Sequence, residues 1–297
     1  MRTRDFLAVT LAAVLWGSGG VVGALITRDE GVGPLSVAMW RMLVGGLALL
    51  VVVIVVPRLR PRSLSAQAWR RIAATGALTA LFEALYFSAI SLSSVGLATL
   101  IGIGSSPFFA AVFDWAFHRV RPTRRTVFAL VLALVGLGLL LSGSLQLGAN
   151  GLLGGLLAVA NGATFAGIAV LNRKPVEGLH PIPLTAIGFT FGGVLLIPVA
   201  ALSGIGAASG LSGWALILVL GVAMTAVAYA AFLTGLATVP PFVATIVALL
   251  EPLVATVLGV IVLAERLGPS GMVGAAALGA AVTLLRPRRQ EPQLATT

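Results

Sequence analysis

The sequence predicts an all-α membrane protein: ten transmembrane helices in two inverted five-helix repeats, with both chain ends in the cytoplasm. Three observations predict this fold, namely an apolar composition, long apolar runs separated by short loops, and equivalent residues that recur 145 positions apart. Of the 297 residues, 59% are hydrophobic and 9% are charged, and the mean hydropathy is +1.08. Soluble domains carry about 25% charged residues, so the composition excludes an ordinary soluble protein.

The apolar runs give the helices in chain order. About 20 residues span the hydrocarbon core of a bilayer, and proline-containing loops separate most of the runs. The first run follows Arg2 and Arg4 and is too long for the apolar part of a signal peptide, so we expect it to remain as the first helix. The expected helices cover residues 6–26, 35–56, 70–91, 95–117, 124–141, 151–171, 184–203, 213–236, 242–263 and 268–286.

The basic residues orient these helices. Cytoplasmic loops of membrane proteins carry an excess of Lys and Arg. If the N-terminus is inside, only Arg28 and Arg266 lie outside, beside acidic neighbours, and Arg41 lies within the second helix. The others all become cytoplasmic: Arg2, Arg4, Arg58, Arg60, Arg62, Arg70, Arg71, Arg119, Arg121, Arg124, Arg125, Arg173, Lys174, Arg286, Arg288 and Arg289.

A repeat at a fixed offset divides the chain into two halves. The equivalent pairs are Pro107 and Pro252, Arg121 and Arg266, and Trp16-Gly17 and Asn161-Gly162. Because each half has five helices, an odd number, the second copy enters the membrane upside down. Inverted repeats with a binding site between them are typical of secondary transporters; a chance offset between two apolar segments is the alternative. We expect repeats over residues 1–146 and 147–289 and a disordered tail over 290–297.

The composition also excludes several classes of function. The chain has no cysteine, which excludes disulfides and thiolate metal sites. The formal charge of +10 does not indicate a nucleic acid partner, because the arginines follow the pattern of membrane loops. The two histidines, His118 and His180, fall in loops, and no Walker or Rossmann glycine pattern occurs. We therefore expect no enzyme activity, no cofactor and no metal.

Three charged residues are expected at mid-depth in the membrane: Arg41, Glu83 and Glu251. A charge at the bilayer centre costs about 2.5–3.5 kcal/mol on insertion scales, so such residues usually face the bundle or a cavity. Pro252 removes a backbone N–H next to Glu251, which indicates a hinge beside a polar cavity. Pro107 is the equivalent hinge candidate. The alternative is a kinked packing helix with a neutral glutamate.

Each of the other two charges has two interpretations. Glu83 shares a helical face with Tyr86 or Phe87. It would either carry a proton or meet a substrate ammonium group, or else pair with Arg41 across the bundle. Arg41 would either bind a substrate carboxylate as a fork, or anchor its helix and pair with an acid.

Weaker candidates complete the expected binding site. Asn161, Thr164 and Phe165 form a polar and aromatic stripe on one helix, Tyr229 lies on another, and Trp16 is expected at mid-depth in the first helix. Each alone is more often a packing residue. Asp114, near a helix end, is expected to cap that helix or to pair with Arg119 or Arg121, and Gly19 and Gly23 are expected only to let helices pack closely.

Several of these motifs resemble a known family. They are Trp16-Gly17-Ser18, Arg41, Glu251-Pro252 and Ala264-Glu265-Arg266-Leu267. The chain resembles the drug/metabolite transporter superfamily in its EamA-type ten-helix branch, from about Leu7 to Leu285. Its opening stretch is similar to that of aromatic amino acid exporters in this branch. One departure is Arg119-Val120-Arg121-Pro122, where the family often has Glu-Arg-Leu, so no role is carried over to that loop.

The resemblance and the repeats together favour a secondary transporter. The resemblance implies export of aromatic and other neutral amino acids, or related metabolites, across a bacterial inner membrane by alternating access. The alternatives are a passive channel for small solutes, a transporter of another metabolite or drug, and a membrane receptor. Toxic organic cations are a second substrate class. Residues 124–141 and 268–286 lack mid-depth polar groups, which suits scaffold or homodimer contacts.

Overall fold

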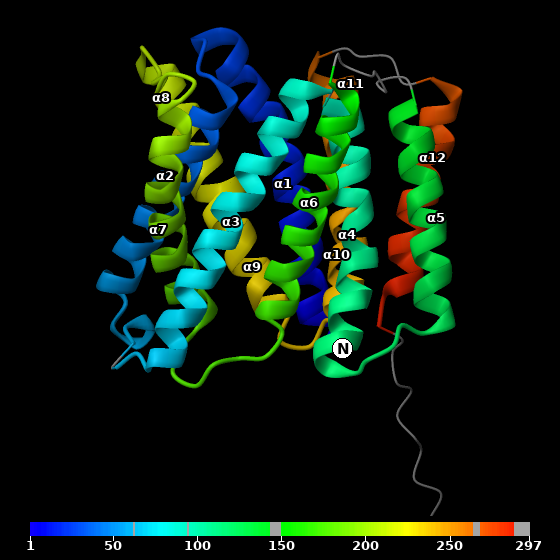
Figure 1. Cartoon of the computed structure of the whole chain (residues 1–297), viewed down its shortest axis with the longest axis horizontal. Helices are drawn as coiled ribbons and strands as arrows, with labels where there is room; N and C mark the ends of the chain where they lie inside the picture. Colours follow the sequence, from blue (N-terminus) through cyan, green and yellow to red (C-terminus); the bar gives the residue numbers. More distant parts are fainter. Residues whose placement is uncertain (62, 94, 143–149, 264–267, 288–297) are drawn as a thin grey trace, which may run out of the picture.

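The computed structural model describes residues 1–61, 63–93, 95–142, 150–263 and 268–287. The predicted motif over 264–267 and the predicted tail over 290–297 lie outside these residues. Within the described residues the regular elements are helices that cross a single bundle from face to face (Figure 1). In the described part of the chain, nine helical stretches are long and apolar enough to span a membrane, and a tenth, Pro269–Leu285, is slightly shorter. The prediction of a ten-helix membrane protein is confirmed.

The first half of the chain forms five crossings. Ser65 and Thr123 cap the third and fifth by accepting hydrogen bonds from the backbone N–H groups of Ala68 and Thr126. Gly31, with φ of 66°, ends the first helix in the left-handed conformation that glycine tolerates best. The helices are α1 (Thr3–Glu30), α2 (Pro34–Val55), α3 (Ala66–Leu92), α4 (Val95–His118) and α5 (Arg124–Leu141), with a 3-10 turn at Pro57–Leu59.

The second half forms the other five crossings, two of which are divided into shorter elements. They are α6 (Gly151–Leu171), α7 (Pro181–Ala201), α8 (Leu211–Gly221) continued by η3 (Val222–Val227) and α9 (Ala228–Gly235), α10 (Pro241–Ala248) with α11 (Leu250–Leu263), and α12 (Pro269–Leu285). Prolines begin α7, α10 and α12, where the missing N–H has no helical partner to lose.

Two of these crossings depart from the single helices that the sequence predicts. In the eighth, η3 is a π-helix, and the Thr225 hydroxyl donates to the carbonyl of Leu220, five residues back, at 2.8 Å. In the ninth, the helix is interrupted at Leu249, between α10 and α11. Pro252 has no N–H to bond the carbonyl of Ala248 four residues earlier, which explains the interruption. By contrast, α4 continues through Pro107.

The N-terminus of the chain and the C-terminal end of α12 lie on one face of the bundle (Figure 1). We call it the arginine-rich face, because it holds the exposed residues Arg58, Arg60, Arg70, Arg119, Arg121, Arg124 and Arg125. The N-terminus of α1 and the C-terminus of α6 lie there, so these helices run in opposite directions. α1 packs against η3, α9 and α11, whereas α6 packs against α3 and α4. α5 and α12 pack on each other at one edge of the bundle (Figure 1), as expected for scaffold helices.

Candidate substrate-binding site

A cavity of about 420 Å³ lies between the two halves of the chain. Its inner end is at Trp16 and Glu251, and it extends to Thr27, Arg28 and Pro34 at the turn between α1 and α2. That turn lies on the face opposite the arginine-rich face, which the predicted orientation makes the external one. Cavities of about 300–1,000 Å³ accommodate small organic molecules, so the size suits a metabolite.

Aromatic rings form one wall of the cavity. Trp16 meets Phe165, Tyr229 and Phe232 with ring centroids at 5.8, 4.8 and 5.2 Å. The rings of Phe82 and Phe165 are 5.5 Å apart. Edge-to-face and tilted rings at these distances pack favourably. The Trp16 indole N–H is buried and has no hydrogen-bond partner among the described residues, so it can donate to a ligand.

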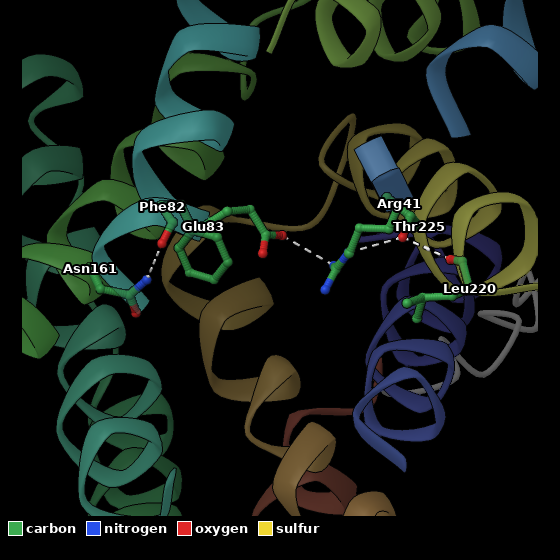
Figure 2. A network of polar contacts seen from close by, with 6 residues as sticks. All are labelled: Arg41, Phe82, Glu83, Asn161, Leu220 and Thr225. Atoms are coloured by element: carbon green, nitrogen blue, oxygen red, sulfur yellow. Dashed lines mark hydrogen bonds and ion pairs between the residues drawn. The ribbon is translucent and has the colours of Figure 1, made fainter. Parts of the chain in front are cut away.

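An ion pair crosses the bundle beside this wall. Arg41 Nη2 on α2 lies 3.2 Å from Glu83 Oε1 on α3, and Arg41 Nε donates to the Thr225 hydroxyl on η3 at 3.1 Å (Figure 2). Of the two interpretations of each charge, the structure therefore favours pairing between them. Both residues also line the cavity, with the Glu83 side chain 2% exposed and that of Arg41 18% exposed.

Glu251 is the other acid of the cavity. It lies in the first turn of α11 and lines the inner end of the cavity. In the part of the chain that the structure describes, its carboxylate makes no hydrogen bond or ion pair. A carboxylate at membrane depth normally has a partner. Because Arg41 is engaged with Glu83, Glu251 is the acid that remains available to a ligand.

Eight of the ten predicted binding residues line the cavity, and two do not. Those that do are Trp16, Arg41, Glu83, Tyr86, Phe87, Phe165, Tyr229 and Glu251. Asn161 lies behind the wall, where its Nδ2 donates to the carbonyl of Phe82 at 2.8 Å (Figure 2). The Thr164 hydroxyl donates to the carbonyl of Ala160 on its own helix. Asn161 therefore joins α6 to α3 behind the cavity wall, whereas the hydrogen bond of Thr164 lies within α6.

Some residues of the cavity were not predicted from the sequence. Phe82 lines it next to Glu83, and Gly20 and Gly23 line it on α1. A Cβ atom on Gly20 or Gly23 would meet nothing within 4 Å, so these glycines widen the cavity. Gly19 also lines the cavity, but a Cβ there would lie 3.2 Å from Met224 Cβ, so this glycine lets α1 pack closely against η3. The signal in the sequence was the run of small residues in α1, which we interpreted only as packing.

Asp114 has other partners than the expected ones. Its carboxylate accepts hydrogen bonds from Arg173, in the segment after α6, and from His118 Nδ1 at 3.0 Å. The expected pairing with Arg119 or Arg121 is therefore wrong. Tertiary packing explains the difference, because the C-terminal ends of α4 and α6 meet at the arginine-rich face and bring Arg173 to Asp114. Arg119 instead stacks over the ring of Trp115, with its Cζ 5.8 Å from the centroid.

A comparison with known families identifies the chain. The EamA-like transporter family matches it twice, over residues 4–142 and 152–286. The chain belongs to this family. It is therefore a membrane transporter, as the predicted resemblance to the drug/metabolite transporter superfamily implied, and its family favours transport over enzyme activity.

Individual relatives match the chain over almost its full length. The uncharacterized transporter YwfM of Bacillus subtilis (strain 168) is 33% identical over 96% of this chain and 95% of its own. An uncharacterized transporter of Archaeoglobus fulgidus is 28% identical over 93% of this chain and 94% of its own. Neither name specifies a substrate. A solved crystal structure of another protein superposes with a TM-score of 0.79 over 96% of each chain at 18% identity, which shows the shared fold.

We predict that the Arg41–Glu83 pair stabilises the fold as a unit. Removing one partner of a buried ion pair costs about 3–5 kcal/mol, because the other charge stays buried without compensation, whereas replacing both by apolar residues is often neutral. Glu83→Leu should therefore lower the thermal unfolding midpoint in detergent more than Arg41→Leu/Glu83→Leu does. Glu177→Leu, at an exposed acid in the loop before α7, is the control. Equal or additive losses in the single and double variants would contradict the prediction.

Proposed function

We propose that this transporter exports small amino acids, aromatic and other neutral ones, or related ammonium-bearing metabolites, by alternating access. The observation that carries the proposal is the Glu251 carboxylate, which has no partner among the residues that the structure describes and lies at the inner end of an aromatic-walled cavity. Export and the bacterial inner membrane rest on the family resemblance.

The cavity offers a complementary group to each part of an amino acid. Glu251 can accept hydrogen bonds from the ammonium group, and aromatic faces attract the same cation. Two donors are available to the carboxylate, the Trp16 N–H and Arg41 Nη1, which has no partner among the described residues. The rings of Phe82, Phe87 and Phe165 would surround an apolar side chain.

The shape of the cavity supports a carrier over a channel. The cavity reaches one face of the bundle and ends at mid-depth near Trp16 and Glu251. At the arginine-rich face, the C-terminal end of α6 is bonded to α3 through Asn172 and Thr75 and to α4 through Arg173 and Asp114. A channel needs a path through both faces at once, whereas a carrier opens them in turn. Toxic organic cations are the second candidate class, because Glu251 and the rings would also hold a cation that lacks a carboxylate.

Transport by purified protein in proteoliposomes tests this function. We expect saturable uptake of labelled phenylalanine or another neutral amino acid, with acceleration by unlabelled substrate on the other side, which a channel does not show. An imposed pH gradient will separate proton coupling from facilitated diffusion. The absence of flux for every amino acid in a panel that also includes organic cations would refute the amino acid assignment, and flux of the cations alone would establish the second class.

Glu251→Gln should weaken binding of the ammonium group. A hydrogen bond to a charged group contributes about 1.5–3 kcal/mol, so we expect a roughly 10- to 100-fold loss of affinity for the amino acid. Inhibition by an analogue without the ammonium group, such as 3-phenylpropionate, should change little. Both are measured by competition against labelled substrate. Glu177→Gln, which keeps the same chemistry on the exposed loop before α7, should leave both unchanged. Equal losses for both ligands would exclude the proposed contact.

We propose Pro252 and Pro107 as hinges between the two open states. Alanine at position 252 supplies an N–H that can bond Ala248 and join α10 to α11, so the helix should bend less easily. We expect the maximal transport rate to fall roughly tenfold, with smaller changes in affinity. Pro198→Ala is the control, since that proline lies exposed within α7. Unchanged transport in Pro107→Ala and in Pro252→Ala would exclude the hinge role.

A further inference from the structure

The same helix face has opposite environments in the two halves of the chain. On α1, the residues Gly23, Ala24, Thr27 and Arg28 line the cavity. The residues 145 positions later, at the C-terminal end of α6, are Ile168, Ala169, Asn172 and Arg173. Ile168 and Ala169 are fully buried, and Asn172 is 8% exposed. The end of α1 is therefore open, and the equivalent end of α6 is closed.

Polar contacts of Asn172 and Arg173 join the closed end of α6 to the first half of the chain. Asn172 Nδ2 donates to the hydroxyl of Thr75 on α3 at 3.1 Å. One residue further along the chain, the Arg173 guanidinium donates to the buried carboxylate of Asp114 on α4, and His118 contacts the same oxygen. The Asp114 side chain is 3% exposed and that of Arg173 25% exposed. These contacts hold α6 against α3 and α4 at the arginine-rich face.

The open end of α1 lacks the equivalent groups. The position that corresponds to Asp114 is Gly259, and the one that corresponds to Thr75 is Leu220, which lines the cavity. Arg28, the counterpart of Arg173, pairs at 2.6 Å with its neighbour Asp29, and both side chains are exposed. Among the described residues, the ion pair at this mouth thus lies within one helix and does not tie α1 to α11.

We propose that the Asp114–Arg173 ion pair is a one-sided lock that keeps the arginine-rich face closed and makes the conformation seen here the resting state. The inference rests on the alternating access proposed above. When the protein opens to the arginine-rich face, α6 leaves α4 and the pair is broken, whereas closing the other mouth forms no ion pair between positions 28 and 259. The exchange between the two states is therefore biased toward the conformation in which the cavity opens at α1.

The chain offers a matched pair of reporters for this bias. It contains no cysteine, so Ala24→Cys and Ala169→Cys each introduce a single thiol at equivalent positions. Ala24 is exposed in the cavity, and Ala169 is fully buried. Labelling by a bulky water-soluble maleimide is measured on purified protein in detergent, without substrate. With Asp114 present, we expect fast modification of Ala24→Cys and slow modification of Ala169→Cys.

Removing the lock should change the two labelling rates in opposite directions. In Asp114→Asn we expect the rate at Ala169→Cys to rise about tenfold and the rate at Ala24→Cys to fall, because a lost pair shifts the population toward the other state. Arg173→Gln should act in the same way, and the double variant should add little to either single change. Glu177→Gln, at an exposed acid near the same face, is the control.

The result separates the lock from the proposed substrate. If both charge variants remain folded, as judged by their unfolding midpoints, and leave both labelling rates unchanged, the lock is refuted. If Asp114→Asn does not fold, Arg173→Gln decides the question alone. Labelling needs no amino acid, so the two proposals can fail separately. A shift in both labelling rates without any amino acid flux would support the lock and refute the substrate assignment. Amino acid flux with unchanged labelling rates would support the substrate assignment and refute the lock.

Discussion

The ion pair between Arg41 and Glu83 is the interaction on which the rest of the site depends. An isolated charge in the middle of an apolar bundle is costly, and the pair neutralises two such charges at 3.2 Å. A third element holds the arginine in place, because Arg41 also donates a hydrogen bond to Thr225 on η3. The hydroxyl of Thr225 is presented by a π-turn, in which it bonds Leu220 (Figure 2). Three helices from both halves are thereby fixed around one point, and the cavity forms beside it.

Close contacts between glycines and the backbone of neighbouring helices set the positions of α1, α11 and α6 around the cavity. A Cβ on Gly17 would lie 2.5 Å from the carbonyl oxygen of Glu251 and 2.7 Å from Val254 Cβ, so α1 and α11 approach as closely as they do only because residue 17 is glycine. Gly162 is pressed in the same way against Gly102 on α4. The first contact brings Glu251 next to Trp16, and the second closes the wall behind Phe165. Small residues here determine where the ionisable and aromatic side chains lie.

The sequence was sufficient for the number of crossings. Eight of the ten residues that it predicted for the site line the cavity, because charged and aromatic side chains at mid-depth are rare and therefore informative. It was not sufficient for helix rotation. Asn161 and Thr164 lie on a helix that is otherwise apolar, so the sequence alone did not indicate that their side chains lie outside the cavity. The π-turn at Thr225 adds one residue to a turn without changing the apolar run. Asp114 was assigned to near neighbours, while its partner, Arg173, is 59 positions away and is brought there only by tertiary packing.

The two halves share a scaffold but not a chemistry. The EamA-like family matches both halves, yet Arg41, Glu83 and Glu251 correspond to Ala186, Ala228 and Ser106, and Trp16 corresponds to Asn161. A symmetric scaffold gives two arrangements of similar packing energy, since each half can adopt the conformation of the other. Substrate selectivity, and the preference for one of the two arrangements, must then come from side chains present in only one half. In the proposed mechanism, the charged residues of the site are Arg41, Glu83 and Glu251, and the residue that distinguishes the two faces is Asp114. On this proposal, selectivity and resting state can change independently of the fold.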